Sequence, residues 1–134
     1  MLEPKKLKHR KQQKGKSKGI ERRATELCFG SFGIMSLSTH WLDSKQIEAA
    51  RRIIIRYLKK GGKLWLRIFP DKPRTFKGNE VPMGGGKGDV SHYVFPIKPG
   101  RIIFEIDGIN EEMAKQAFKE AADKLPIKTK FIAK

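Results

Sequence analysis

Apolar residues recur at the spacing of one helix face in the stretch that follows Asp43. Asp43 with Gln46 three positions later indicates a capping box, and Gly61-Gly62 indicates where the helix ends. The cations of this stretch fall on the other side, so we predict a helix with one core face and one cationic face. The apolar stripe comprises Ile47, Ala50, Ile53, Ile54, Tyr57 and Leu58.

A second helical stripe follows Asn110, a residue type that is preferred at the N-cap. Glu111 and Glu112 stand in the first turn, where the helix dipole favours negative charge, and Pro126 predicts the end of the helix. We therefore predict a second amphipathic helix. Its buried stripe comprises Ala114, Ala117, Phe118, Ala121 and Leu125.

Other segments have the alternation, or the β-branched and aromatic content, of strands. They span residues 27–37 (a bent strand or a strand pair), 63–69, 92–97, 101–106 and 127–132. Lys98-Pro99-Gly100 predicts a type II turn that joins two of them as a hairpin, and Cys28 is predicted to be a buried, unreactive core residue. These elements indicate an α+β fold: a single domain with two helices packed on one side of a mainly antiparallel sheet.

Residues 69–90 separate two predicted strands but are rich in the residues that strands and helices avoid. Pro70, Pro73 and Pro82 each lack a backbone donor, and the glycines at positions 84, 85, 86 and 88 favour an irregular backbone. Irregular segments of this length are usually functional or disordered. Because cations flank it, we predict a long Gly/Pro-rich loop that reaches toward an anionic partner. These cations are Lys72, Arg74, Lys77 and Lys87.

The charge of the chain narrows the class of partner. Thirty Lys and Arg residues stand against 14 Asp and Glu residues, which gives a net charge of +16. A field of this size favours nucleic acid or an anionic membrane surface. No apolar run reaches the roughly 20 residues that a membrane-spanning helix needs. Of the two partner classes we favour nucleic acid and expect no membrane partner. The single cysteine excludes an internal disulfide.

Residues 1–23 form a basic N-terminal tail with ten Lys and Arg residues, two Glu residues and three large apolar side chains. This composition cannot offset the entropy of ordering, so we predict a tail that is disordered alone and ordered on a polyanion. A merely solvated tail and an organelle-import peptide are the alternatives, but import peptides favour Arg and Ser, whereas this tail is Lys-rich and interrupted by Gly15 and Gly19. We assign residues 1–23 to RNA binding and residues 24–134 to the folded domain.

The glycine run does not fit the phosphate-binding motifs of nucleotide enzymes. A P-loop would require Gly and then Ser or Thr where the chain has Val81 and Gly88, and the dinucleotide motif would require Gly where it has Asp89. The three histidines are scattered, without metal-ligand spacing. We predict no catalytic residue, no metal, no cofactor and no small-molecule substrate, and hence a protein that is not an enzyme.

The chain contains, in order, MLEPKKLKHRKQQKGKSKG, CFGSFG, QIEAARR, KLWLRIFPDKP, MGGGKG, KPGRIIFEIDG and KLPIKTKF. In this order and spacing the motifs resemble the bacterial and organellar ribosomal protein L-sixteen family of the large subunit, over essentially the whole chain. The resemblance implies a hammerhead-type α+β fold, binding to large-subunit rRNA near the peptidyl transferase centre, support of late subunit assembly, and help in positioning A-site tRNA. It implies rRNA, tRNA and neighbouring large-subunit proteins as partners.

The resemblance and the charge pattern together define two sets of candidate residues. The rRNA-binding set comprises Lys5, Lys6, Lys8, Arg10, Lys11, Lys14, Lys16, Lys18, Arg22, Arg23, Lys45, Arg52, Arg56, Lys59, Lys60, Lys72 and Arg74. The tRNA-proximal loop comprises Pro82, Met83, Gly84, Gly85, Gly86, Lys87 and Gly88.

Two loop positions depart from the family pattern, because Pro82 and Gly85 stand where bacterial members commonly have basic residues. These losses and the Lys and Ile enrichment favour an organellar ribosome, mitochondrial rather than plastid, with the bacterial cytoplasm as the alternative. Two other functions stay open: a free RNA-binding or RNA-chaperone protein outside the ribosome, and a phosphate-handling enzyme that uses the glycine loop, against which the failed motifs argue.

Overall fold

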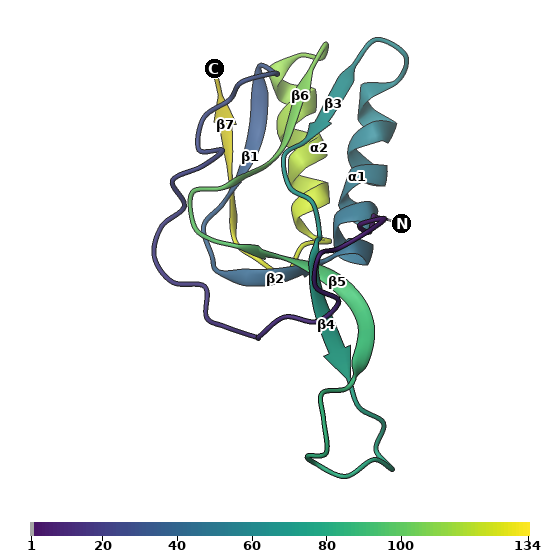
Figure 1. Cartoon of the computed structure of the whole chain (residues 1–134). Coiled ribbons are helices and arrows are strands. Elements are labelled where there is room, and N and C mark those ends of the chain that lie inside the picture. The colour runs from purple at the N-terminus through teal and green to yellow at the C-terminus, as the bar shows by residue number, and fades with distance from the viewer. Residues whose placement is uncertain (1) are drawn as a thin grey trace.

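The computed structural model describes residues 2–134, which form two helices and seven strands arranged in two antiparallel sheets (Figure 1). The larger sheet has, in order, β3 (Lys63–Leu66), β6 (Ile102–Asp107), β1 (Phe32–Ser36) and β7 (Thr129–Ala133). The smaller sheet has β5 (Asp89–Ile97) between β2 (His40–Asp43) and β4 (Lys72–Phe76). The helices α1 (Ser44–Leu58) and α2 (Glu111–Ala122) lie side by side against one face of the larger sheet. The predicted single α+β domain is confirmed, but its strands form two sheets rather than one.

The division into two sheets occurs at the predicted turn between β5 and β6. The Arg101 N–H donates to the Lys98 carbonyl oxygen at 3.3 Å, and Gly100 has a φ of 97°, as the third position of a type II turn requires. The turn is therefore present, but the predicted hairpin is wrong. β5 pairs with β2 and β4, whereas β6 pairs with β1 and β3, so the turn carries the chain from one sheet to the other.

The core lies between the helices and the larger sheet, and most of both predicted helical stripes is buried there. Ile53 and Tyr57 are only half-buried, and Leu125 is buried beyond the end of α2. On α1 the buried residues are Ser44, Ile47, Ala50, Ile54 and Leu58, and on α2 they are Ala114, Ala117, Phe118 and Ala121. β6 supplies the centre of the core, because every residue from Ile102 to Ile106 is inaccessible to solvent. Burial of these large apolar side chains is the main stabilising contribution to the fold.

Several predicted ends were wrong. α2 ends at Ala122, four residues before Pro126, because main-chain bonds from Lys124 to Ala121 (3.0 Å) and from Leu125 to Ala122 (3.1 Å) tighten the chain into turns. At the C-terminus of α1 the positive φ falls on Lys59 (51°) rather than on Gly61-Gly62. Within the predicted strand region 27–37, only the residues of β1 form a regular strand. The strand β2 was not predicted.

The predicted capping box of α1 is confirmed and allows a stability prediction. The Asp43 carboxylate accepts the Lys45 N–H at 3.4 Å, and the Asp43 N–H donates to the Gln46 side-chain oxygen at 3.0 Å. Asp43→Ala should therefore lower the free energy of unfolding by about 1 kcal/mol, measured by urea denaturation. Lys45→Ala is the control and should change it by less than about 0.5 kcal/mol. An equal loss of stability in both variants would show that the cap is not the cause.

Candidate nucleic-acid interface

The segment predicted as an irregular loop over residues 69–90 contains a β-hairpin. The prediction is wrong for residues 72–76 and 89–90, which lie in strands, and right for residues 69–71 and 77–88, which are irregular. β4 pairs with β5 from Lys72 opposite Val94 to Phe76 opposite Asp89. Pro73 is tolerated in β4 because this strand lies at the edge of its sheet, where a missing donor costs no ladder bond to an outer neighbour. The hairpin projects away from the helices and carries the irregular residues 77–88 at its far end (Figure 1).

The tip of the hairpin is shaped by glycines and holds little charge. The three glycines at positions 84–86 have φ values of 109°, 74° and 111°, and an added Cβ on any of them would meet nothing within 4 Å. They are therefore needed for backbone conformation rather than for close packing. The Lys77 ammonium donates to the first of these carbonyl oxygens at 2.7 Å. Glu80 is the only ionisable residue in the stretch 78–86, and Met83 is 98% exposed, so the tip presents backbone and apolar groups.

The N-terminal tail forms no helix or strand over residues 2–23 and contacts the hairpin at two positions, Lys72 at the start of β4 and Lys87 just before β5, which we call the hairpin base. Lysine side chains join the two segments: Lys11 donates to the Lys87 carbonyl oxygen at 3.1 Å, and Lys87 donates to the carbonyl oxygen of Gln12. Lys72 donates to the Lys14 carbonyl oxygen at 2.6 Å. Carbonyl oxygens carry no net charge, so these bonds leave the lysines unneutralised. The tail and the hairpin base therefore form one cationic surface.

The tail meets the domain near its predicted boundary after residue 23. The Glu21 N–H donates to the Pro99 carbonyl oxygen at 2.9 Å, and the Ile102 N–H donates to the Ala24 carbonyl oxygen at 2.8 Å. At the other end of the tail, Leu2 packs against the hydrophobic core. The cationic stretch between these two contacts thus touches the folded domain at both ends.

The cationic face of α1 forms a second surface. Lys45, Arg52, Arg56, Lys59 and Lys60 are all exposed there, as the helical spacing predicts. The positive charge of this face is partly neutralised by a residue of the same helix, because the Glu48 carboxylate pairs with both Arg51 and Arg52. The hydrogen bond from Arg51, despite the opposing effect of burial, lowers the pKa of Glu48 below its ordinary value. Leu2 lines a hollow of about 360 Å³ together with these three residues, so the start of the tail reaches α1.

The structure thus arranges the predicted rRNA-binding residues in two groups: the tail with the base of the hairpin, and the outer face of α1. All of them are exposed except Lys11 and Lys72, which are half-buried. The tRNA-proximal residues are exposed at the far end of the hairpin, apart from the half-buried Gly88, whose backbone lies against that of Phe76. RNA contact by these residues stays a prediction.

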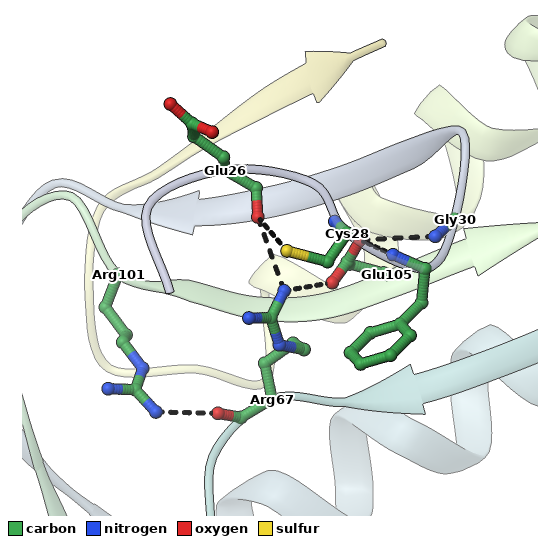
Figure 2. Close-up of polar contacts among 7 residues, drawn as sticks. Glu26, Cys28, Gly30, Arg67, Arg101 and Glu105 are labelled. Atoms are coloured by element: carbon green, nitrogen blue, oxygen red, sulfur yellow. Dashed lines mark hydrogen bonds and ion pairs between the residues drawn. The ribbon is translucent and has the colours of Figure 1, made fainter. Parts of the chain in front are cut away.

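The sequence interpretation missed a buried carboxylate that fixes the segment between the tail and β1. Glu105 on β6 is 0% exposed, and one of its oxygens accepts the main-chain N–H groups of Cys28 (2.8 Å), Phe29 (3.0 Å) and Gly30 (3.2 Å). Its other oxygen pairs with Arg67 (Figure 2). Cys28 is exposed and lies outside any strand, so its prediction as a buried core residue is wrong.

The surroundings of Glu105 keep its carboxyl group ionised. Burial alone would raise its pKa, but the hydrogen bonds from Phe29, Arg67, Gly30 and Cys28 outweigh burial and lower the pKa below that of an ordinary Glu. The signal that could have revealed this residue is a carboxylate in the middle of the apolar run IIFEI, because a buried charge is retained only with partners.

No group of three or more His, Cys, Asp or Glu side chains within residues 2–134 could hold a metal ion. In the same part of the chain, no helix is both long and apolar enough to cross a membrane. The ionised Glu105 lies beneath the surface with all its bonds used inside the protein, so it serves the fold.

A compact α+β domain with a cationic tail, a projecting hairpin and a second cationic face is typical of the class of basic nucleic-acid-binding proteins. The chain matches the family described as ribosomal protein L16p/L10e over residues 4–132. It therefore belongs to this family of ribosomal proteins, which are structural components and not enzymes.

Two relatives show how closely the chain follows the family. It is 54% identical over 134 residues to the large ribosomal subunit protein uL16 of Porphyromonas gingivalis, an alignment that covers 100% of this chain and 93% of the relative. It is 52% identical over 132 residues to the large ribosomal subunit protein uL16 of Halorhodospira halophila, which covers 98% and 96%. Both relatives are bacterial, so the expected organellar origin gains no support, whereas the bacterial alternative is consistent.

Proposed function

We propose that this protein is a constituent of the large ribosomal subunit that binds large-subunit rRNA near the peptidyl transferase centre. The observation that carries the proposal is the single cationic surface formed by the tail and the hairpin base, whose lysines donate to carbonyl oxygens and keep their charge. Phosphate groups are the anions that such an extended surface fits. The names of the two bacterial relatives support the large subunit as the place.

The two halves of the interface would have different tasks. The tail and the outer face of α1 carry the charge needed to hold rRNA and to fix the protein during late subunit assembly. The hairpin tip carries no free cation between positions 78 and 86 but projects far from the domain (Figure 1). Its proposed task is to reach A-site tRNA and help to position it, through shape more than through charge.

Sedimentation of the native protein tests the proposed place. A ribosomal constituent should travel with the large subunit in about one copy and should leave it only under conditions that strip other proteins. A free RNA-binding or RNA-chaperone protein would instead be found mainly outside the subunit fraction, and this result would refute the proposal. We also expect the tail to become ordered when it binds RNA. Amide NMR of the free protein and of the complex measures this ordering.

Binding to deproteinised large-subunit rRNA should weaken steeply with salt. The single-strand relation gives a log–log slope of about −0.7 per phosphate contact, so six contacts give a slope of roughly −4. A titration between about 50 and 200 mM salt measures it. Replacing Lys5, Lys6 and Lys8 by Gln should reduce the magnitude of the slope by about 2, whereas Glu112→Gln should leave it unchanged. A nearly flat titration would contradict the electrostatic basis of binding.

A further inference from the structure

Trp41 on β2 holds two cations of the opposite edge strand of its sheet. The Lys72 ammonium lies 4.8 Å from the centre of the indole ring, and the Arg74 guanidinium carbon lies 5.6 Å from it. Both cations come from β4, and β5 lies between β2 and β4. Two like charges this close in sequence repel each other, and the negative face of an indole ring offsets that repulsion. Trp41 thereby brings two cationic groups to one place.

This place is a hollow of about 200 Å³ with walls from three parts of the chain. Gln12 and Lys14 come from the tail, Trp41 comes from β2, and the hairpin contributes the rest of the lining. Lys72 adjoins the hollow, because it contacts both the Trp41 ring and the Lys14 carbonyl oxygen. The residues that line it are Gln12, Lys14, Trp41, Pro73, Arg74, Thr75 and Lys87.

The charge of this hollow has no counter-charge among the residues that the structure describes. None of the ion pairs among residues 2–134 includes the four cations Lys14, Lys72, Arg74 and Lys87, and no carboxylate lines the hollow. The Thr75 hydroxyl and the Gln12 amide can donate further hydrogen bonds there. Converging cations and neutral donors of this kind suit an anion with several acceptor oxygens, such as a phosphate group.

We propose that the hollow binds one phosphodiester group of the RNA and that Trp41 is the positioning residue of this site. The inference rests on the proposed RNA-binding function and makes it specific. Because the tail and the hairpin share the hollow, a phosphate bound there would join them, and the tail would become fixed on the hairpin when RNA arrives. Trp41 would keep Lys72 and Arg74 in place before the phosphate enters.

Trp41→Leu should lower the affinity of the full-length protein for deproteinised large-subunit rRNA by roughly fivefold, since both cation–π contacts are lost. The salt slope should not change, because no cation is removed. Arg74→Ala should instead reduce the magnitude of the slope by about 0.7 to 0.9. Trp41→Phe keeps an aromatic face and should bind with an affinity between those of the wild-type protein and Trp41→Leu. Lys124→Ala removes an exposed cation elsewhere and is the matched control, expected to bind as the wild type does.

Tryptophan fluorescence distinguishes a direct effect of RNA on Trp41 from a merely structural effect of the substitution. The chain has two tryptophans, so Trp65→Phe leaves Trp41 as the only one, and its fluorescence should change saturably upon addition of rRNA. The change should disappear in the Arg74→Ala/Lys87→Ala background. Inorganic phosphate is titrated separately and should give a much weaker response than rRNA.

The outcomes separate this inference from the proposed function. Absence of rRNA binding by the wild-type protein would refute both. Normal rRNA binding with wild-type affinity in Trp41→Leu, or equal affinities of the Leu and Phe variants, would overturn only the site. A Trp41 response that saturates with inorganic phosphate but does not occur with bound rRNA would make the hollow a site for free anions, which also overturns the inference.

Discussion

Glu105→Gln should lower the free energy of unfolding by about 3 kcal/mol, although the two side chains have nearly the same shape. The buried Glu105 accepts three main-chain N–H groups and pairs with Arg67. Gln keeps one acceptor oxygen, but its NH₂ group would face the Arg67 guanidinium, so a buried donor would meet a donor and the cation would lose its counter-charge. Urea denaturation of both proteins at neutral pH measures the difference.

The same variant should have a flatter dependence of stability on acid pH. The donors around Glu105 lower its pKa in the folded protein below the ordinary Glu value of about 4.3. Its ionised form therefore contributes full stability above that ordinary value, and this contribution is lost as the pH falls through the lowered folded-state pKa. Thermal unfolding from neutral pH to about pH 3 should show the wild-type protein losing its advantage over Glu105→Gln.

Glu26→Gln is the matched control, because the exposed Glu26 carboxylate points away from Arg67 (Figure 2). We expect a change below about 0.5 kcal/mol. Equal losses in the two variants would show that Glu105 has no special role. Replacing both partners, as Glu105→Leu with Arg67→Met, should cost less than the sum of the two single changes, since neither charge is then left buried alone.

The helices could be predicted because their signals are local. Asp43 with Gln46 and the stripe behind them lie within one stretch of chain, and the structure confirms both the cap and the buried face. Asn110 likewise caps α2 and accepts the Met113 N–H at 2.8 Å. Propensity and spacing decide such elements before any distant segment is in place.

Strand pairing could not be predicted, since it depends on residues far apart in sequence. A turn of suitable chemistry at Lys98-Pro99-Gly100 predicts a hairpin, yet β6 already has β1 and β3 on its two sides. Pro73 argues against a strand by its own chemistry, and only its place at the edge of a sheet permits β4. Proline is generally excluded from strands, and the exception for edge strands could not be foreseen because it depends on where the strand lies in the folded protein.

The candidate site, too, could be predicted only in part from the sequence. Composition is enough to predict cationic surfaces, and the predicted cations are at the surface apart from the half-buried Lys11 and Lys72. Composition does not predict which cations meet. Trp41 and Arg74 lie 33 positions apart in sequence and come together only because β5 pairs with both of their strands. A site built from tail, β2 and hairpin exists only in the folded chain.

Shortening the hairpin tip should separate stability and rRNA binding from the positioning of tRNA. Phe76 stands opposite Asp89 at the end of the β4–β5 pairing, so Lys77 and Gly88 can flank a two-residue Asn-Gly turn that replaces residues 78–87. The removed tip buries no core residue, and the free energy of unfolding should change by less than about 1 kcal/mol. The variant should still enter large subunits, because all cations of the tail and of the α1 face remain, although the contacts of Lys87 with Lys11 and Gln12 are lost.

Binding of A-site tRNA by subunits that carry the shortened protein should fall by roughly tenfold, which corresponds to about 1.4 kcal/mol. The expected loss comes from lost reach, since the tip holds no free cation between positions 78 and 86. The truncation also removes Lys87, so full-length Lys87→Ala is the control and should retain most tRNA binding. Assembled subunits are assayed for tRNA binding and peptide synthesis, and the free proteins for thermal stability. Normal tRNA binding by the shortened protein together with a collapsed melting temperature would make the tip a structural element, because its removal would then affect the fold and not the ligand.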